Sequence, residues 1–355
     1  MPEKARIAVI GTGWWATTAH LPALQEDPDA EIVAVSDLRP EVLAKAAEHY
    51  GVAATYADHQ EMLQQEEPDG VVVAVYHSAH YDVARDCLEA GAHTLLEKPM
   101  VLTAPHARSL VELASANGRE LIMGYPFQYT PHARRARQVL TTGELGEIRY
   151  VNSLFATMVL QFMRGDDSEY EKVFNYPVVG PGNVYNDPAR SGQGQGHLQV
   201  THSAGLVFYL TDLVPARVTG LMANMDLPCD IVDAISVRME SGALASIGST
   251  GIMRPGDDDH HETRIFCDAG WVDINPLGGT LSIRHADQSF EQPDKLEGEA
   301  IYPMRAPAQN LVQVALGNGA NDSPAEVGWR TVELLDAAYR SAAQDGAPVD
   351  VESLY

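Results

Sequence analysis

The first third of the chain alternates between two hydrophobic patterns. Short apolar runs typical of buried strands are followed by segments in which apolar residues recur every three or four positions, as on one face of a helix. We predict strands at residues 7–10, 31–36, 54–56, 70–75, 93–97 and 120–124, and helices at 14–26, 40–50, 59–65, 79–90 and 104–117. This alternation indicates a parallel sheet with helices on both faces.

The alternation stops after Gly146. Strand-like segments then follow one another at residues 147–160, 216–225, 231–240, 243–250, 263–267, 270–273 and 280–284, with turn residues between them. Such a series predicts a large, mainly antiparallel open sheet. A helix is predicted from His197 to about Leu210. Helical periodicity returns from about Pro307, and residues 326–345 form an amphipathic helix that we expect to be structural.

Composition narrows the class of protein. The 355 residues, 45% of them hydrophobic, are enough for two domains with two cores. A net charge of −25 repels nucleic-acid backbones, so we expect no nucleic-acid partner. Three widely spaced cysteines, no signal peptide and no apolar run of membrane-spanning length predict a cytoplasmic protein that does not contact a membrane. We expect no metal site, because no His or Cys cluster has metal-ligand spacing.

The glycine turn Gly11–Ala16 carries the first chemical signal. Four apolar residues run directly into Gly11-Thr-Gly-Trp-Trp-Ala16, which opens the first predicted helix. Gly11 supplies backbone freedom, Gly13 lets a pyrophosphate come close to the backbone, and Ala16 lets the helix sit tightly on the strand. Unpaired N–H groups at the helix start would then face the phosphates. The alternative is an ordinary strand–helix turn.

Asp37 ends the second predicted strand, 21 positions after Ala16. A carboxylate there is placed to accept hydrogen bonds from the adenosine ribose and repels a 2′-phosphate, which favours NAD. Arg39 lies close enough to hold such a phosphate, so NADP is the alternative. The alternative is that Asp37 is a strand-end cap or a turn residue.

The carboxyl ends of parallel strands line the ligand crevice of such a sheet. An apolar strand carries Lys98 to that edge, and Pro99 fixes the exit of the chain. Desolvation there would lower the pKa of the Lys98 ammonium and suit it to proton relay or to donation to a substrate oxygen. The alternative is a solvated lysine paired with Glu97.

These residues resemble the Gfo/Idh/MocA family, which includes glucose–fructose oxidoreductase, inositol 2-dehydrogenase and rhizopine-catabolism proteins. The segments that carry the resemblance are Gly11–Leu24, Glu89–Pro99 and Gly143–Ile148, so it covers nearly the whole chain. It implies a Rossmann doubly wound parallel sheet in residues 1–124. A C-terminal α+β domain with the antiparallel open sheet would fill residues 125–355, and its last helix would pack back near the first domain. It also implies a homo-oligomer, a dimer or tetramer, formed through the outer face of that sheet.

The resemblance also assigns roles to residues. Lys98 of the Glu-Lys-Pro motif serves catalysis near the nicotinamide, and His202 matches a histidine beside the substrate. The family's aspartate before that histidine is replaced by Leu198, so Gln199 or His197 would supply the missing polar contact. For all three polar residues the alternative is a structural role: His202 as a core histidine, His197 and Gln199 in helix capping or solvent contact.

Other positions depart from the family pattern. Val75-Tyr76-His77 replaces its usual tip of the fourth strand, and Pro126 replaces an asparagine, so Tyr76, His77 and Tyr125 are expected to shape an altered pocket. The expected cofactor contacts are Gly11, Thr12, Gly13, Trp14, Trp15, Ala16, Asp37, Arg39, Tyr76, His80, Glu97 and Lys98. The expected substrate contacts are Lys98, Tyr125, His197, Gln199 and His202, with Lys98 and His202 catalytic.

The function that follows is NAD(P)-dependent hydride transfer to or from a secondary alcohol of a sugar, glycoside or cyclitol. Two alternatives stay open. The first is redox-assisted glycoside cleavage, in which the sugar is oxidised transiently and the aglycone is eliminated. The second is a cofactor-binding regulator without turnover, because a fold does not determine a function.

Overall fold

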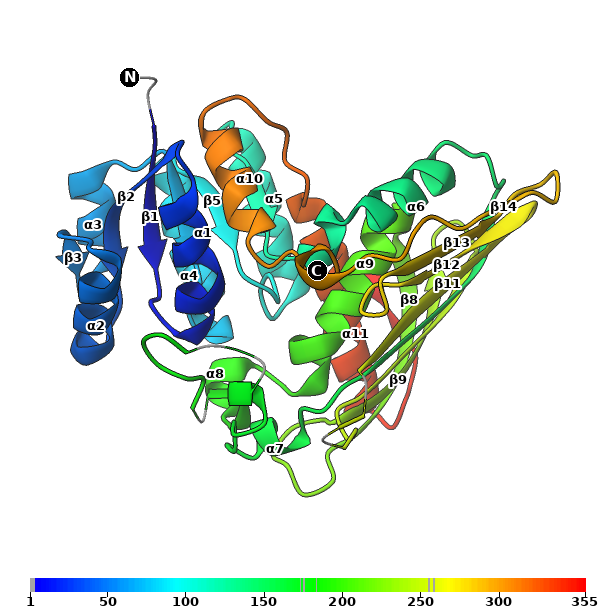
Figure 1. The fold of residues 1–355 in the computed structure, drawn as a ribbon. Coiled ribbons are helices and arrows are strands. Elements are labelled where there is room, and N and C mark those ends of the chain that lie inside the picture. Colours follow the sequence, from blue (N-terminus) through cyan, green and yellow to red (C-terminus); the bar gives the residue numbers. More distant parts are fainter. Residues whose placement is uncertain (1–3, 173, 175, 183, 255, 258) are drawn as a thin grey trace.

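Two sheets organise the computed structural model, which describes residues 4–355 except 173, 175, 183, 255 and 258 (Figure 1). The first sheet is parallel and has the strand order β3-β2-β1-β4-β5-β6. Its order reverses between β1 and β4, which is the switch point where doubly wound sheets bind ligands. Its strands are β1 (Ala5–Ile10), β2 (Ala30–Ser36), β3 (Thr55–Tyr56), β4 (Gly70–Val73), β5 (His93–Leu96) and β6 (Leu121–Met123).

Helices cover both faces of the first sheet, as predicted. On one face α1 (Leu21–Glu26), α2 (Pro40–Tyr50) and α10 (Ala306–Ala315) share a core with alternate strand residues such as Ile7 and Val72. On the other face lie α3 (His59–Glu66), α4 (His80–Glu89) and α5 (Ala104–Ala116), which pack on the intervening residues such as Ala8 and Val71. Figure 1 shows α10, in orange, beside this sheet although it comes from the far end of the chain.

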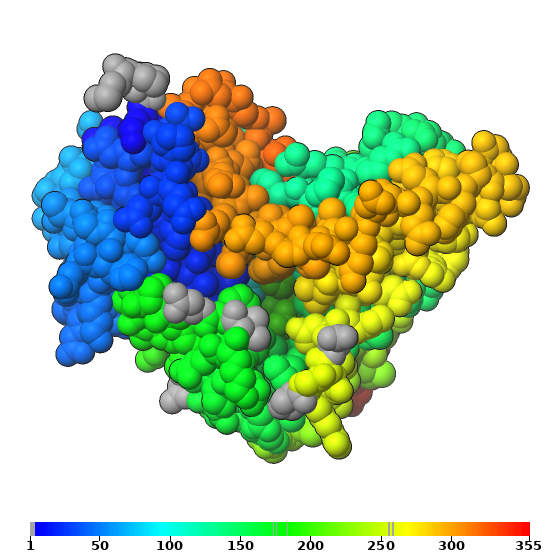
Figure 2. Space-filling model, viewed as in Figure 1, coloured from blue at the N-terminus to red at the C-terminus, as the bar shows by residue number. Residues whose placement is uncertain are grey.

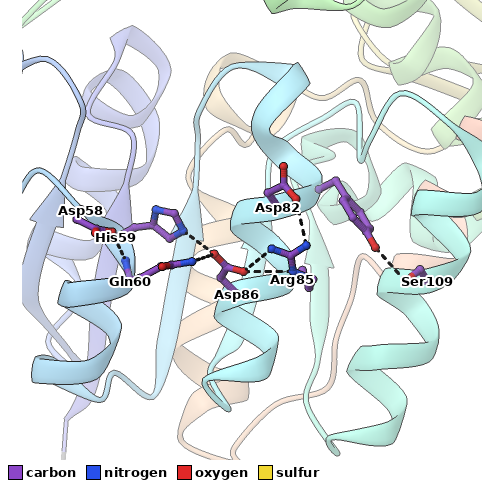
Figure 3. A network of polar contacts seen from close by, with 8 residues as sticks. Asp58, His59, Gln60, Asp82, Arg85, Asp86 and Ser109 are labelled. Atoms are coloured by element: carbon purple, nitrogen blue, oxygen red, sulfur yellow. Dashed lines mark hydrogen bonds and ion pairs between the residues drawn. The ribbon is translucent and has the colours of Figure 1, made fainter.

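A polar network joins α3 to α4 on the surface of the first half (Figure 3). Asp58 caps α3 by accepting a hydrogen bond from the Gln60 backbone N–H at 2.9 Å. The Asp86 carboxylate of α4 pairs with His59 Nε2 at 3.0 Å, and it accepts hydrogen bonds from Gln60 Nε2 at 2.7 Å and Arg85 Nη2 at 2.8 Å. These contacts fix the start of α3 close to the carboxyl edge of the first sheet.

The second sheet is mainly antiparallel, with only β7 and β10 parallel, and has the order β14-β13-β12-β11-β7-β10-β9-β8-β15. On its inner face lie α6 (Pro131–Thr141), α9 (Thr201–Thr211) and α11 (Ala325–Ala342), and α11 also packs against α5. The predicted fold class is confirmed. The strands are β7 (Ile148–Ala156), β8 (Pro215–Ala223), β9 (Val232–Met239), β10 (Leu244–Thr250), β11 (His260–Cys267), β12 (Gly270–Asn275), β13 (Thr280–Arg284), β14 (Phe290–Glu291) and β15 (Val349–Asp350).

Some predicted boundaries were wrong. The strand predicted at 147–160 ends at Ala156, because the chain turns to bond with Gly251 and then forms the short helix α7 (Leu160–Met163). The strand predicted at 70–75 ends at Val73. Helix α6 was not predicted, although Thr130 caps it through its hydroxyl and Pro131 occupies its first turn, which is a recognisable start signal.

The segment between α7 and α9 lies beneath the carboxyl ends of the first sheet. Figure 1 shows α7 and α8 (Pro188–Ser191), in green, at that edge, and α8 contacts the turn His77–Ala79 that follows β4. Figure 2 shows the same green segment on the surface between the blue first half and the yellow strands. A segment of the second half therefore faces the ligand-binding edge of the first.

Candidate active site

A cavity of about 730 Å³ lies at the carboxyl edge of the first sheet. It is lined by the glycine turn, by the ends of β2, β4 and β5, by the start of the helix that includes α9, and by side chains from residues 155–185 and 298–304. It therefore spans the switch point between β1 and β4 and reaches the second sheet. Both halves of the chain contribute to one site.

Gly11 and Gly13 of the turn are suited to glycine for two different structural reasons. Gly11 has φ +88°, and a Cβ there would lie 2.4 Å from the Ala74 carbonyl oxygen, so only glycine fits. Around Gly13 the nearest atom to an added Cβ is Arg39 Nη2 at 3.6 Å, and Gly13 lines the cavity. Gly13 thus keeps its backbone open to the cavity. This geometry fits the close approach of a pyrophosphate. Thr12 and Ala16, also predicted contacts, are fully buried and do not line the cavity.

Asp37 and Arg39 form a tight pair at the end of β2. Asp37 accepts hydrogen bonds from Arg39 Nε at 2.9 Å, Arg39 Nη2 at 2.8 Å and the Thr12 backbone N–H at 2.9 Å. Burial by itself would raise the pKa of Asp37, but the hydrogen bonds and charge of Arg39 outweigh it and hold that pKa below its ordinary value. The carboxylate predicted to bind ribose is therefore ionised, and Arg39 lies over the Tyr76 ring at the cavity wall.

Glu97 is the centre of a buried network that the sequence did not reveal. Its Oε1 pairs with His20 Nε2 at 2.8 Å and accepts a hydrogen bond from Trp15 Nε1 at 2.8 Å. A Cβ at Gly124 would lie 2.6 Å from the same oxygen, so glycine there leaves room for the carboxylate. Burial would raise the pKa of Glu97, but His20 and the nearby Lys98 ammonium keep it below its ordinary value. The indole of Trp15 is thereby fixed beside the cavity.

Lys98 points from the end of β5 to the second half of the chain. Its Nζ donates a hydrogen bond to the Leu198 carbonyl oxygen at 3.1 Å. Burial lowers the pKa of Lys98 to about 8, and the Glu97 carboxylate opposes that shift. Lys98 is therefore a partly buried cation at neutral pH, with a proton that it loses more easily than an ordinary lysine does.

His202 lies one helical turn after Leu198 and lines the same cavity as Lys98. Its ring is buried and makes edge-to-face contacts with Phe127 and Phe155, with centroid distances of 6.0 and 6.3 Å. Burial, and then the positive charge of Lys98, hold the pKa of His202 well below its ordinary value, so the imidazole is neutral. Its Nδ1 has no hydrogen-bond partner among the described residues. The structure thus brings Lys98 and His202 together as an ammonium and a neutral imidazole.

The remaining predicted residues divide into two groups. Trp14, Trp15, Tyr76, His80 and Gln199 line the cavity, and His80 is held by a 2.7 Å contact between its Nδ1 and the Pro99 carbonyl oxygen.

Tyr125 and His197 are not brought to the cavity. The Tyr125 hydroxyl bonds to Thr201 Oγ1 at 3.0 Å, and the His197 ring packs 4.8 Å from that of Tyr339 on α11. His197 lies in the π-helical turn Gly196–Val200, where its ring packs against Tyr339 of α11 and does not line the cavity.

Aromatic side chains of the second half make up a wall that sequence reasoning missed. Their spacing follows neither a helix nor a strand period, so no pattern marked them. The aromatic wall consists of Phe155, Phe162, Tyr170, Phe174, Tyr185 and Tyr302.

The described residues offer neither a metal-binding cluster nor a membrane-spanning helix. Within them, no group of three or more His, Cys, Asp or Glu side chains is arranged to hold a metal ion. No helix of the described part of the chain is long and apolar enough to cross a membrane.

Two family models match the chain. Residues 5–125 match the oxidoreductase family with an NAD-binding Rossmann fold, and residues 133–273 match the GFO/IDH/MocA C-terminal domain. D-Glucoside 3-dehydrogenase of Escherichia coli K12 is 35% identical over 143 residues, which span 40% of this chain and 41% of that protein. A 1-carboxy-3-chloro-3,4-dihydroxycyclohexa-1,5-diene dehydrogenase of Comamonas testosteroni is 29% identical over 77% of this chain and 62% of its own length.

Solved structures share the whole architecture. Levoglucosan dehydrogenase in complex with NADH and levoglucosan matches with a TM-score of 0.81, at 18% identity, over 98% of this chain and 100% of that chain. GenD2 from gentamicin A biosynthesis, in complex with NAD, matches with a TM-score of 0.78, at 23% identity, over 99% and 97% of the two chains. At these identities the likeness shows the fold, with both halves present.

Proposed function

We propose, from the premise that this chain belongs to the Gfo/Idh/MocA family of NAD-binding oxidoreductases, that it is an NAD(P)-dependent sugar dehydrogenase. Its substrate would be a secondary alcohol of a sugar, glycoside or cyclitol. The observation that carries the proposal is the meeting of Lys98 and His202 in one cavity with the glycine turn. The cavity is large enough, at about 730 Å³, for a dinucleotide end and a small polyol together.

The first half of the chain holds the cofactor in this proposal. The open backbone at Gly13 would contact the pyrophosphate, and the ionised Asp37 would accept hydrogen bonds from the adenosine ribose. NAD, when bound, accepts or returns the hydride of the sugar carbon. Tyr76, His80 and Trp15 line the cavity between these contacts and Lys98, where they would exclude water from the reacting atoms.

Lys98 and His202 handle the proton of the substrate hydroxyl. The neutral imidazole of His202 accepts the proton, because its low pKa keeps it unprotonated in the resting site. The Lys98 ammonium donates a hydrogen bond to the same oxygen and stabilises the negative charge that develops on it. Gln199, three residues before His202, lines the cavity and orients a neighbouring hydroxyl.

The test is a screen of purified protein over sugars, glycosides and inositols, following the absorbance of reduced cofactor. We expect turnover with at least one of these classes, and a loss of at least about 100-fold in kcat for Lys98→Ala and for His202→Ala, as is typical of a general acid or base. Lys4→Ala is a matched control at an exposed lysine that does not line the cavity.

Full turnover by Lys98→Ala would contradict the assignment. Aglycone release without net cofactor reduction would favour redox-assisted cleavage. Tight NAD binding with no turnover on any polyol would favour a regulator.

The outer face of the second sheet is proposed as the contact between copies of the chain. Tyr150, Leu244 and Phe266 lie opposite one another on neighbouring strands and are each about 40% exposed. Contiguous apolar patches of this kind mark interfaces on soluble proteins. Light scattering should report a dimer or tetramer, and Leu244→Asp should dissociate it. A cytoplasmic location accords with the free cysteines Cys87, Cys229 and Cys267.

A further inference from the structure

Asp230 lies just before β9, and its side chain is buried. Three consecutive backbone N–H groups of the turn 194–198, which leads into α9, donate to this one residue. The Gly194 N–H donates to Asp230 Oδ1 at 2.9 Å, and the Gly196 N–H donates to Oδ2 at 2.7 Å. The Gln195 N–H between them donates to the Asp230 carbonyl oxygen at 2.9 Å. The first N–H groups of a helix have no partners within it, so Asp230 supplies these partners from another part of the chain.

The turn 194–198 also packs closely around this contact. A Cβ at Gly194 would overlap the Asp230 carbonyl oxygen, and a Cβ at Gly196 would overlap the Tyr339 hydroxyl of α11. Only glycine at these two positions lets the backbone come so close. The turn is therefore built to fit Asp230, and it has little room to move while this contact is intact.

The segment that carries Asp230 is itself fixed to the second sheet. The Ile231 N–H donates to the Ala223 carbonyl oxygen at the end of β8, and the Ile231 carbonyl oxygen accepts from the Gly251 N–H after β10, each at 2.9 Å. The Leu198 side chain belongs to the same buried apolar cluster as Ile231. Backbone and side-chain contacts thus tie the turn 194–198 to a rigid sheet.

The position of this turn matters for Lys98. Leu198 offers the carbonyl oxygen that accepts a hydrogen bond from Lys98 Nζ at 3.1 Å. Because the lysine side chain is long and flexible, the place of its ammonium depends on where that oxygen lies. Helix α9 is buried at every position from Thr201 to Thr211, so its own packing holds His202. Asp230 therefore affects the position of Lys98 rather than that of His202.

A second carboxyl group, that of Asp233 on β9, is buried close to Asp230. Burial, and then the negative charge of Asp230, raise the pKa of Asp233 well above its ordinary range, so Asp233 is neutral. The charge that faces the N–H groups of the turn is that of Asp230. Hydrogen bonds to a charged acceptor are shorter and stronger than those to a neutral one. Asp230→Asn would remove this charge and leave one acceptor oxygen where two N–H groups need one each.

We propose that Asp230 is a positioning residue for the dehydrogenase reaction. It fixes the turn 194–198, and through the Leu198 carbonyl oxygen it holds the Lys98 ammonium at the substrate oxygen. The inference rests on the proposed function, because it takes the role of Lys98 from it. It adds a residue that does not line the cavity, and that lies in the second half of the chain, to the determinants of the reaction rate.

The test is a double-mutant cycle on kcat with the best sugar substrate. Asp230→Asn should lower kcat at least about 10-fold, because a displaced ammonium no longer stabilises the charge on the substrate oxygen. In the Lys98→Ala background the same substitution should lower kcat less than about twofold, because the group that Asp230 positions is already gone. Equal losses in the two backgrounds would show a general structural role and overturn the proposal.

NAD binding provides a further readout. The glycine turn Gly11–Ala16 lies in the first half of the chain, away from the contacts of Asp230. The dissociation constant for NAD, measured by calorimetry, should therefore change less than about twofold in Asp230→Asn. A rise in this constant as large as the loss in kcat would contradict a specific effect on Lys98.

Asp336→Asn is the matched control. Its buried carboxylate also accepts a backbone N–H at a helix start, that of Ala104 at 3.0 Å, but no residue of α5 lines the cavity. This variant should lower the free energy of unfolding and leave kcat unchanged. A loss of kcat as large as that of Asp230→Asn would show that destabilisation alone explains the result. Asp230→Ser, which keeps one acceptor oxygen, replaces Asp230→Asn if the latter does not fold.

Hydrogen exchange tests the holding of the turn without any turnover. In Asp230→Asn the backbone amides of residues 194–198 should exchange at least about 10-fold faster, while those of residues 201–211 keep their rates. Unchanged exchange over 194–198 would overturn the proposal. If the parent protein turned over no sugar or cyclitol, the proposed function would fail, and the exchange rates would still decide whether Asp230 holds the turn.

Discussion

Replacing each glycine of the turn by alanine should separate folding from cofactor binding. At Gly11 the added Cβ would lie 2.4 Å from the Ala74 carbonyl oxygen, on a backbone with φ +88°. A residue with a Cβ in the left-handed region costs about 1–2 kcal/mol of folding stability, and overpacking against the backbone costs about 1–3 kcal/mol more. Gly11→Ala should therefore lower the free energy of unfolding by about 2–5 kcal/mol.

Gly13→Ala is the matched control on the same turn. Its Cβ would meet no atom closer than 3.6 Å, and its φ lies outside the left-handed region, so its free energy of unfolding should change by less than about 0.5 kcal/mol. The methyl group would instead occupy space at the cavity that the pyrophosphate needs. We expect the dissociation constant for NAD to rise at least about 10-fold, which is about 1.4 kcal/mol of binding free energy.

The measurements are urea denaturation followed by circular dichroism, and NAD titration followed by calorimetry. Gly11→Ala should show its unfolding midpoint shifted with an unchanged slope, since the native surface is the same. Gly13→Ala should show a normal midpoint and weak NAD binding. The reasoning is refuted if Gly11→Ala is as stable as the parent protein, or if Gly13→Ala is the less stable of the two.

Three further predictions follow from single side chains. Because burial lowers the pKa of Lys98 to about 8, the ammonium loses its proton as the pH rises through that value, so kcat/KM for sugar oxidation should fall above about pH 8; a flat profile to pH 9.5 would contradict the role of the charge. Asp37→Ser should raise the ratio of kcat/KM with NADP to kcat/KM with NAD at least 10-fold. The substitution removes the charge that repels a 2′-phosphate and releases Arg39 to bind that phosphate. An unchanged ratio would show that Asp37 and Arg39 do not determine the choice of cofactor. Asp336→Ala should lower the free energy of unfolding, measured by urea denaturation, by about 1.5–3 kcal/mol. The reason is that the buried Asp336 carboxylate accepts a hydrogen bond from the Ala104 backbone N–H, at the start of α5, at 3.0 Å. A loss below about 0.5 kcal/mol would show that this helix start needs no partner.

Local sequence determined which elements form and which of their ends carry chemistry. The apolar runs before Gly11 and Lys98 are strands, because a strand buried in a parallel sheet needs apolar residues on both of its faces. This requirement can be read directly from the local sequence. Gly11 was identifiable because one backbone conformation excludes every other residue type. Helix α6 was not predicted, although the Thr130 cap followed by Pro131 is a start signal in the local sequence.

The tertiary structure decided which of these groups meet. The Leu198 carbonyl oxygen accepts a hydrogen bond from Lys98 Nζ, 100 positions away, and Glu97 pairs with His20, 77 positions away. These contacts form because strand ends and helix starts converge only when the sheets are formed. His197 lies outside the cavity, against the expectation from the family resemblance, because its ring packs against Tyr339 of α11. The aromatic wall has no sequence period, since its members come from a strand (Phe155), a short helix (Phe162) and the turns and loops between elements, and only the folded chain brings these together. Sequence acts through neighbours along the chain, whereas a site is made of neighbours in space.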